Sequence, residues 1–489
     1  MSTGPLAVAA IDLGATSGRV MLGVLENGRI ELVPARRFEN TLVEREGHLC
    51  WDLEALWAEI RQGLADAHSL ARVRGLPGLA SIGVDSWAVD YGLVGPDGSE
   101  PGELIGEVIA YRDSRTDGAA ERVAQRVSRA RQFALTGIAQ QPFNTAYQLA
   151  AEDRLADLPA GSTLLLVPDL IGHLLTGERR TERTNASTTG MLTADGQGWS
   201  AELLQAVGVD PGLLAPLIDP GERLGTVRPE LGAQLGIGEV PVIAVGSHDT
   251  ASAVLAVPAH GTAPVAYISS GTWSLIGLEL ASPVLTEEAR EAGFTNEGGV
   301  GATVRLLKNV AGMWLVTESI RQWEEEEGAR VELTDLLEAA AAVPGDRFRI
   351  DPTDPAFLAP GRMADRVTAA ARPLEGEDEF PRTPAQLVRC LLESLAETYR
   401  EELHAACRLA GVPFPEQLHV VGGGSRNALL NQLTAEALGI EVVAGPMEAT
   451  ALGNVALQCR ALGAIPAEPG AIRALVRASV ELESFGPGA

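Results

Sequence analysis

The stretch AVAAIDLGATSGRVMLGVLENGRIELVPA, residues 7–35, contains three apolar segments separated by two turns. The first segment, residues 7–12, is short and almost wholly apolar, which is typical of a buried strand. The next two, residues 19–25 and 29–35, flank an Asn27-Gly28 pair. An Asn-Gly pair between two apolar runs predicts a β-hairpin. We therefore expect the first strand to lie beside this hairpin in one sheet.

A helix and a further strand follow the hairpin. Apolar residues recur at helical spacing over residues 53–68, and Asp52 is a natural N-cap for that helix. Residues 79–84 form another apolar run, which follows a Pro-Gly turn and ends at Asp85. Strands that alternate with helices predict an α/β layer.

The order of strand, glycine turn and strand recurs in the second half of the chain. An apolar strand at 240–245 leads into Gly-Ser-His-Asp, and a strand at 263–268 is followed by a glycine turn and by a strand at 274–280. A chain of 489 residues exceeds what one hydrophobic core organises. We interpret the pattern as a duplicated architecture, with an N-terminal domain at residues 1–245 and a C-terminal domain at 246–489.

The charge balance excludes some classes of partner. Lys and Arg total 38 and Asp and Glu total 65, which gives a net charge of −27. Such an acidic chain does not favour a nucleic-acid backbone or an anionic membrane, so any phosphate site must be made locally. The apolar run near the N-terminus is too short for a signal peptide or a membrane span. The four cysteines show no CxxC spacing and are typical of reduced thiols, so we expect a cytoplasmic protein.

Three glycine-rich turns each follow an apolar strand, at residues 12–19, 269–272 and 422–425. Glycine lets backbone N–H groups approach phosphate oxygens, because no Cβ intervenes. Arg19 adds the positive charge that the chain lacks on average. A GxxxxGK[ST] motif is absent, and the first turn leads into a hairpin, which favours an actin-like nucleotide fold over a P-loop or Rossmann domain.

Three aspartates at strand ends are candidates for chemistry. A carboxylate at Asp12 or Asp85 either holds Mg²⁺ through water or closes a local turn, and the residues alone leave both interpretations open. Asp249 either accepts a hydroxyl proton during phosphoryl transfer or caps the helix that follows it. His248 lacks a partner at metal-ligand spacing, so we expect it to hydrogen-bond to the substrate or to neighbours.

Two aromatic positions and one polar pair complete the candidates. Trp87 and Trp273 follow strands, where a tryptophan either lines a sugar site or belongs to the core. Lys308-Asn309 interrupts an otherwise apolar run.

Several runs together resemble the FGGY carbohydrate kinases, and within that family the kinases that act on L-rhamnulose. The resemblance extends from residue 10 to about 458, in the order found in that family. It is carried by the first glycine turn and by IGVDSWAVDYGL (82–93), YRDSRT (111–116), PFNTAYQL (142–149), TNASTT (184–189), GSHDTASAV (246–254), SSGTWS (269–274), FTNEGG (294–299), LKN (307–309), VVGGGSRN (420–427) and AGPMEATALGN (444–454).

The resemblance implies an α/β protein with two actin-like (ribonuclease H-like) domains and a central cleft. It implies transfer of the γ-phosphoryl group of ATP to the 1-hydroxyl of a ketose, with Mg²⁺ near Asp12 and with Asp249 as the proton acceptor. L-rhamnulose is the expected ketose. The candidate sugar contacts are Gly83, Asp85, Trp87, His248, Asp249, Thr250 and Asn309.

The nucleotide would lie against the C-terminal domain. At Thr317 related kinases often carry a glutamine that contacts the nucleotide, whereas the threonine is shorter and keeps a hydroxyl. The candidate ATP contacts are Ala15, Thr16, Ser17, Gly18, Arg19, Thr272, Thr317, Gly422, Gly423 and Gly424.

Two other functions fit the same motifs. The first is an FGGY kinase for another ketose, such as fuculose or xylulose. The second is a non-catalytic sugar-binding regulator, which is disfavoured because Asp12, Arg19, Asp249 and Thr272 are all present. We expect a monomer or a homodimer that binds ATP and a sugar and has neither nucleic acid nor membrane as a partner.

Overall fold

The computed structural model describes residues 4–96, 103–260, 264–271, 273–357, 359–374, 381–468 and 470–488. The chain divides into two compact units, each assembled from separate segments. The first unit comprises Met1–Gly261, Leu280–Leu306 and Ala449–Val480. The second unit comprises Thr262–Glu279, Leu307–Glu448 and Glu481–Ala489. The first unit therefore includes three segments beyond the predicted boundary at residue 245, namely 246–261, 280–306 and 449–480. The division into functional domains stays a prediction.

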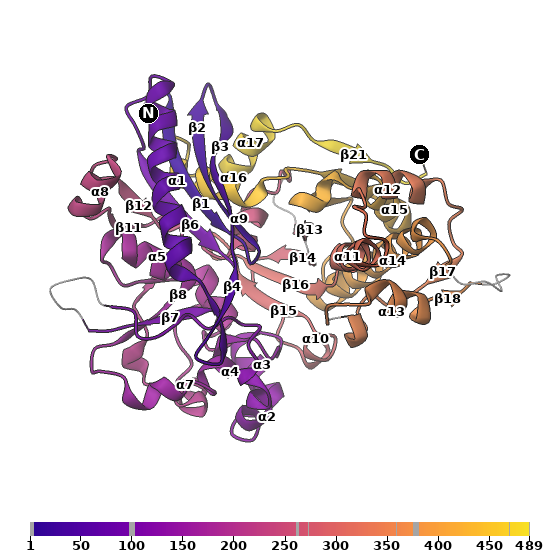
Figure 1. Cartoon of the computed structure of the whole chain (residues 1–489), viewed down its shortest axis with the longest axis horizontal. Helices are drawn as coiled ribbons and strands as arrows, with labels where there is room; N and C mark the ends of the chain where they lie inside the picture. Colours follow the sequence, from indigo (N-terminus) through magenta and orange to yellow (C-terminus); the bar gives the residue numbers. More distant parts are fainter. Residues whose placement is uncertain are drawn as a thin grey trace. The chain divides into compact units, whose positions relative to one another are not determined.

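The first unit is built on a six-stranded sheet with the order β11-β12-β6-β1-β2-β3 (Figure 1). Strand β1 pairs antiparallel with β2 and parallel with β6, and β6 pairs parallel with β12. The expected hairpin is confirmed, because β2 and β3 pair across Asn27-Gly28, both with positive φ. The strands are β1 (Leu6–Leu13), β2 (Ser17–Glu26), β3 (Arg29–Glu39), β6 (Ser81–Ser86), β11 (Arg223–Thr226) and β12 (Pro241–Ile243).

Helix α1 (Leu53–Val73) packs on β2 and β3 (Figure 1). Asp52 caps it as predicted, since its side chain accepts a hydrogen bond from the amide of Ala55. The helix continues beyond the predicted end at residue 68, because Ala71 extends the buried face formed by Leu64 and Ala67.

Strands of the second unit follow the order β16-β14-β13-β19-β20-β21. Strand β13 pairs antiparallel with β14 and parallel with β19, which pairs parallel with β20. This repeats the arrangement around β1, so the predicted duplication and the α/β class are confirmed. The strands are β13 (Val265–Ser270), β14 (Ser274–Leu280), β16 (Val304–Val310), β19 (Gln417–Val421), β20 (Glu441–Ala444) and β21 (Glu483–Phe485).

In the second unit, helical periodicity of the sequence predicts helices over residues 387–409 and 428–438. Helix α14 (Pro384–Ala410) begins at a capping box formed by Thr383 and Gln386, and α15 (Ala428–Leu438) has the predicted bounds. Residues 344–382 are rich in Pro, Asp, Arg and Glu, which predicts an irregular insertion. This is wrong in part, because α13 (Met363–Ala370) lies within the segment and buries Met363 and Val367. Residues 358 and 375–380 of that segment lie outside the described residues.

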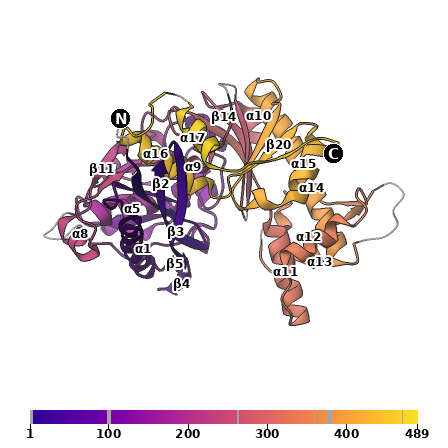
Figure 2. The ribbon, with the colours of Figure 1, turned by 90° about the horizontal axis from the view of Figure 1, so that it is seen from above.

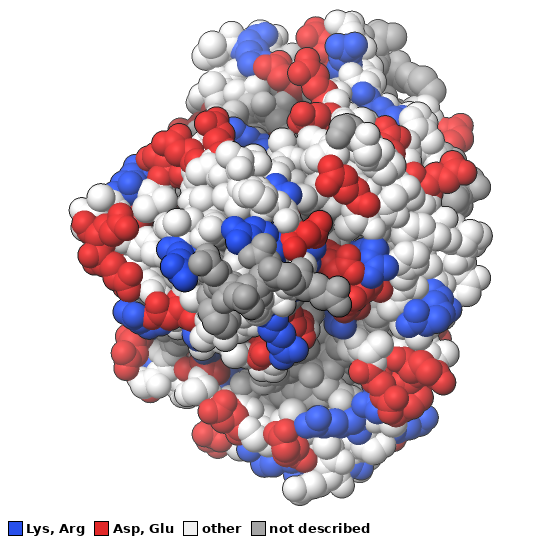
Figure 3. Space-filling view, turned by 90° about the vertical axis from the view of Figure 1, so that its right-hand side faces the viewer, with Lys and Arg blue, Asp and Glu red and all other residues white. Residues whose placement is uncertain are grey.

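Three general features of the chain can be compared with the sequence-based expectations. Acidic and basic side chains interleave over the face drawn in Figure 3. All four cysteines are buried and unpaired with one another. Among the described residues, no helix is both long and apolar enough to cross a membrane.

Helix α16 (Ala449–Ala461), near the end of the chain, belongs to the first unit. It lies beside α9 (Asp249–Leu255) and close to β1 and β6, as Figures 1 and 2 show. Gly453 makes this contact possible, because a Cβ there would lie 1.9 Å from the carbonyl oxygen of Ser252. Gln458 also donates to the carbonyl oxygen of Ala9 at 3.0 Å and accepts from Ser81 at 2.6 Å.

We predict that Gly453→Ala destabilises the first unit. The added methyl group meets rigid backbone of α9, so α9 and α16 must separate, and overpacking of this kind typically costs about 1–3 kcal/mol. The measurement is the free energy of unfolding from urea titrations. Gly198→Ala is the matched control, since no heavy atom lies within 4 Å of a Cβ built there. Equal stability of the two variants would contradict the packing argument.

Candidate active site

Asp12, Arg19 and Asp85 meet because three strands place them in register. Asp12 pairs with Arg19 across the antiparallel β1–β2 ladder and with Asp85 across the parallel β1–β6 ladder. The guanidinium of Arg19 donates to Oδ2 of Asp12 from Nε at 2.8 Å and from Nη2 at 2.6 Å. Two carboxylates and one guanidinium therefore meet where β1 and β6 end, next to the start of β2. This agrees with the expectation that any phosphate site is made locally.

Asp85 is fully buried, and both its burial and the nearby charge of Asp12 disfavour its ionised form. Its Oδ2 accepts from Nδ2 of Asn454 at 2.5 Å, whereas Oδ1 has no hydrogen-bond partner among the described residues. Burial, followed by the negative charge of Asp12, raises the pKa of Asp85 well above its ordinary value, and the Asn454 hydrogen bond opposes that rise. An unpaired buried carboxylate oxygen is costly, so this atom is suited to a donor or a cation that comes with a ligand.

The first glycine turn lies between β1 and β2. The amide of Gly14 donates to the carbonyl oxygen of Ser17 at 2.8 Å, and Asn40 donates from its side chain to the carbonyl of Gly14 at 2.9 Å. Thr16 and Ser17 are exposed, and Ala15 is half-buried. Gly18 is buried against Phe38, where a Cβ would meet the ring at 2.2 Å. The turn thus presents two hydroxyls next to Arg19.

Asp249 is the first residue of helix α9, and the expectation that it caps this helix is wrong, because the N-cap is His248 and no described side chain caps the helix. Its Oδ1 accepts from the Thr250 amide at 2.6 Å and from the Thr250 hydroxyl at 3.1 Å, while 32% of its side chain remains exposed. None of the described residues donates to Oδ2. The carboxylate is therefore oriented through one oxygen and accessible through the other.

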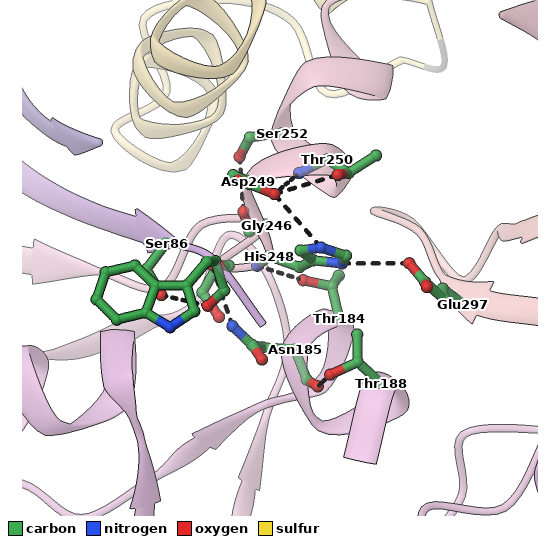
Figure 4. A network of polar contacts seen from close by, with 12 residues as sticks. Ser86, Thr184, Asn185, Thr188, Gly246, His248, Asp249, Thr250, Ser252 and Glu297 are labelled. Atoms are coloured by element: carbon green, nitrogen blue, oxygen red, sulfur yellow. Dashed lines mark hydrogen bonds and ion pairs between the residues drawn. The ribbon is translucent and has the colours of Figure 1, made fainter. Parts of the chain in front are cut away.

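His248 connects Asp249 to a buried ion pair (Figure 4). Its Nε2 lies 3.3 Å from Oδ1 of Asp249. On the other side of the ring, Nδ1 lies 3.0 Å from Nη2 of Arg305 and 3.3 Å from Oε2 of Glu297. The amide of His248 also donates to the hydroxyl of Thr184 at 3.3 Å. The imidazole is held on both sides and 9% of its side chain is exposed.

A second buried carboxylate, Glu182, holds the loop that precedes α9. Glu182 accepts from the amide and hydroxyl of Ser247 at 3.0 and 2.7 Å. It also accepts from the amide and hydroxyl of Thr184 at 2.8 and 2.5 Å. Burial raises the pKa of Glu182, although the hydrogen bonds from Thr184 and Ser247 oppose that effect. Ser247 in turn accepts from the amide of Ser86 at 2.9 Å, which ties the loop to the end of β6.

Trp87 follows β6 and packs on a second tryptophan, Trp51, with ring centroids 4.4 Å apart and ring planes tilted by 43°. Both indole N–H groups donate to Oδ2 of Asp90, at 3.0 Å from Trp87 and 2.6 Å from Trp51. Burial raises the pKa of Asp90 to about 6, against the effect of these hydrogen bonds. Trp87 is 6% exposed, so it is chiefly a core residue.

Gly83 lies within β6 and faces helix α16. A Cβ there would lie 2.5 Å from Oδ1 of Asn454 and 2.7 Å from Nε2 of Gln458. The structure therefore gives this glycine a packing role, and its predicted sugar contact stays a prediction.

The remaining candidates lie in the second unit. Asn309 is exposed on β16, next to Lys308, whose ammonium pairs with Glu402 at 2.6 Å. Thr317 is exposed in the first turn of α11 (Trp314–Glu327). Thr272 lies outside the described residues, and Trp273 is half-buried.

The second and third glycine turns meet at the ends of β13 and β19. A Cβ at Gly422 would lie 2.7 Å from the carbonyl oxygen of Ser270, and one at Gly424 would lie 1.9 Å from the Ser270 hydroxyl. Gly423 has no heavy atom within 4 Å of such a Cβ. Gly422 and Gly424 therefore permit close packing of the two turns, while Gly423 leaves open space for a ligand.

Sequence reasoning missed four polar residues of the site, namely Glu182, Glu297, Arg305 and Asn454. Glu297 and Asn454 stand inside quoted motifs, FTNEGG and AGPMEATALGN, but neither was assigned a role. Arg305 offered one signal, since a charged residue within an apolar strand must be paired when it is buried. Its partners lie on other segments, so the sequence did not reveal them.

Comparison with protein families gives two matches. The model described as the N-terminal domain of the FGGY family of carbohydrate kinases matches residues 7–256. The model described as the C-terminal domain of the same family matches residues 266–462.

Relatives and solved structures agree with that assignment. A rhamnulokinase from Bacteroides thetaiotaomicron is 43% identical, covering 98% of this chain and 95% of its own. One from Enterococcus faecalis is 39% identical, covering 97% and 93%. A ligand-bound xylulose kinase from Lactobacillus acidophilus superposes with a TM-score of 0.78 at 17% identity, covering 99% of this chain and 94% of its own.

A glycerol kinase from Plasmodium falciparum with ADP gives a TM-score of 0.79 at 13% identity, with the same coverage. At such low identity the likeness concerns the fold, and it confirms the expected pair of actin-like domains. Since two domain models cover most of its length and close relatives cover nearly all of it, the chain belongs to the FGGY family of carbohydrate kinases.

Proposed function

We propose that this protein transfers the γ-phosphoryl group of ATP to the 1-hydroxyl of L-rhamnulose. Relatives named rhamnulokinase, 43% and 39% identical over nearly the whole chain, support this substrate. The observation that carries the chemistry is the carboxylate of Asp249, held through Oδ1 and accessible through Oδ2. A carboxylate held in this way can accept the proton of an attacking hydroxyl during phosphoryl transfer.

Asp249 acts as the general base in this proposal. The proton of the 1-hydroxyl moves to Oδ2 of Asp249, the sugar oxygen forms a bond to the γ-phosphorus, and the bond from that phosphorus to the bridging oxygen of ADP breaks. His248 and Thr250 flank the base and would orient the sugar. Asp85 and Trp87 end the neighbouring strand, so they would complete the sugar side together with Gly83 and with Asn309 of the second unit.

Phosphate recognition would use the glycine turns. Arg19 and the hydroxyls of Thr16 and Ser17 are donors suited to phosphate oxygens. In the second unit, the open space at Gly423 would admit the nucleotide close to the backbone. We assign the remaining ATP contacts to Ala15, Gly18, Thr272, Thr317, Gly422 and Gly424.

A magnesium ion fits the acids at the sheet edge. Mg²⁺ keeps several waters and binds one or two carboxylates together with phosphates. The described residues contain no group of three or more His, Cys, Asp or Glu that could hold a metal by themselves. Asp12 and the unpartnered Oδ1 of Asp85 lie in register, so they would hold the ion directly or through water. The bound ion would neutralise charge on the polyphosphate.

The proposal also covers domain roles and location. We assign the sugar chiefly to residues 1–245 and ATP chiefly to 246–489, with Asp249 at the border. Four buried free cysteines support a reducing compartment, which we take to be the cytoplasm. A monomer or a homodimer accords with this proposal.

The substrate is tested with a panel of ketoses and an ADP readout. We expect the highest kcat/KM with L-rhamnulose, because the named relatives act on it. A higher value with fuculose or xylulose would keep the kinase and replace its substrate. ADP release with none of the ketoses would favour a sugar-binding regulator.

We predict that Asp249→Asn lowers kcat by about 10²–10⁴-fold, because the amide cannot accept the hydroxyl proton. The measurement is ADP formation with saturating Mg-ATP and L-rhamnulose. Asp210→Asn makes the same chemical change at an exposed position and should retain the parent rate. Turnover by Asp249→Asn at the rate of Asp210→Asn would remove Asp249 as the base.

We predict a pH-dependent stability term from Asp90. Its pKa of about 6 in the folded protein exceeds the ordinary 3.8, so its contribution is fully present below pH 3.8 and is lost as pH rises through 6. From pH 4 to 7 the free energy of unfolding should fall by about 2 kcal/mol more in the parent than in Asp90→Asn. The measurement is a set of urea titrations across that range, and an unchanging difference between the two proteins would refute the assignment.

A further inference from the structure

Arg305 is fully buried, and its guanidinium is shared among three groups. Its Nε and Nη2 donate to the carbonyl oxygen of Gly298 at 3.1 and 3.0 Å. Its Nη1 forms an ion pair with Oε2 of Glu297 at 3.2 Å, although neither atom has a hydrogen-bond partner among the described residues, and Nη2 also contacts Nδ1 of His248 at 3.0 Å. A buried arginine is costly unless its charge and its donors are matched, so its retention beside the proposed base calls for a purpose.

The contact with Arg305 determines which nitrogen of His248 carries hydrogen. A guanidinium has only donors, so Nδ1 of His248 is the acceptor in its contact with Arg305. In a neutral imidazole the hydrogen then resides on Nε2, which lies 3.3 Å from Oδ1 of Asp249. Glu297 also approaches Nδ1, at 3.3 Å, but the same oxygen faces Nη1 of Arg305. Glu297 therefore serves chiefly to neutralise and hold the guanidinium.

A hydrogen on Nε2 faces the same oxygen of Asp249, at ion-pair distance (3.3 Å). The amide and the hydroxyl of Thr250 already donate to Oδ1, at 2.6 and 3.1 Å. Two hydrogen bonds on Oδ1, together with the imidazole N–H facing it, restrict rotation of the carboxylate. No described residue donates to the other oxygen, Oδ2.

We propose that Arg305 and Glu297 are positioning residues, which hold His248 as the Nε2–H tautomer and thereby reserve Oδ2 of Asp249 for the sugar's hydroxyl proton. Neither residue touches the reacting atoms; both act through His248 (Figure 4 shows His248 between Glu297 and Asp249). The proposal rests on Asp249 as the base of the proposed kinase. It predicts which carboxylate oxygen receives the proton and which buried pair fixes it.

The test replaces both charges at once, with Arg305→Gln and Glu297→Gln in one protein, so that no lone buried charge remains. We expect kcat with L-rhamnulose to fall by roughly 10–100-fold, since misplacement of a catalytic group costs up to about 10²-fold. KM for ATP should stay unchanged. Arg290→Gln with Glu287→Gln removes an exposed ion pair in the same way and should retain the parent rate.

A spectroscopic readout separates positioning from a merely structural role. The chain has seven histidines, so selective ¹⁵N-histidine labelling gives a simple long-range ¹H–¹⁵N spectrum, and His248→Asn identifies the His248 signals. We expect a neutral Nε2–H imidazole in the unmodified protein and a mixture of tautomers in the double variant. An Nδ1–H tautomer or an imidazolium in the unmodified protein would overturn the proposal, whether or not the variant folds.

The two readouts also separate this proposal from the kinase assignment. If no ketose is phosphorylated, the proposed function fails, and the tautomer still decides whether Arg305 orients His248. If L-rhamnulose is phosphorylated and the double variant keeps both the parent kcat and the parent tautomer, the kinase stands and the positioning role is wrong.

Discussion

The site depends on one buried carboxylate that never needs to touch a substrate, Glu182. It accepts hydrogen bonds from Thr184, Asn185 and Ser247, five in all, at 2.5 to 3.2 Å. Burying a carboxylate is costly unless hydrogen bonds satisfy it, and these five donors supply that compensation. Because Ser247 precedes His248 and Asp249, the same bonds fix where helix α9 begins. The backbone that carries Asp249 is therefore fixed before the side chains of His248 and Thr250 orient its carboxylate.

The electrostatics of the site follow from strand register. A chain of net charge −27 repels phosphate on average, and Asp12 and Asp85 add to that repulsion at the sheet edge. Arg19, opposite Asp12, is the local cation, and the buried acid Asp85 responds to its surroundings with a raised pKa. The arrangement suits a ligand that brings its own cation, which is how nucleotides reach kinases. The negative charges of Asp12 and Asp85, which repel phosphate by themselves, would then bind the cation that accompanies the nucleotide.

The sequence predicted local features well and long-range contacts poorly. The hairpin at Asn27-Gly28, the Asp52 cap and the bounds of α15 follow from turn chemistry, capping and periodicity, which act over a few residues. By contrast, Asn454 reaches Asp85 across 369 positions, and no local pattern encodes such a contact. Glu297 and Arg305 were also missed, because their pairing with His248 depends on three segments that meet only in the folded chain. Asp249 itself could be selected, since the family motif around it is long and specific.

The central claim is that Asp249 directs phosphoryl transfer to the 1-hydroxyl of L-rhamnulose. The most direct test is the position of phosphate in the product, read by ³¹P and ¹³C NMR after reaction with Mg-ATP. The account predicts phosphorus coupled to C1 and its two protons, with one ADP formed for each sugar phosphorylated. Phosphorus coupled to another carbon, or inorganic phosphate as the main product, would contradict it.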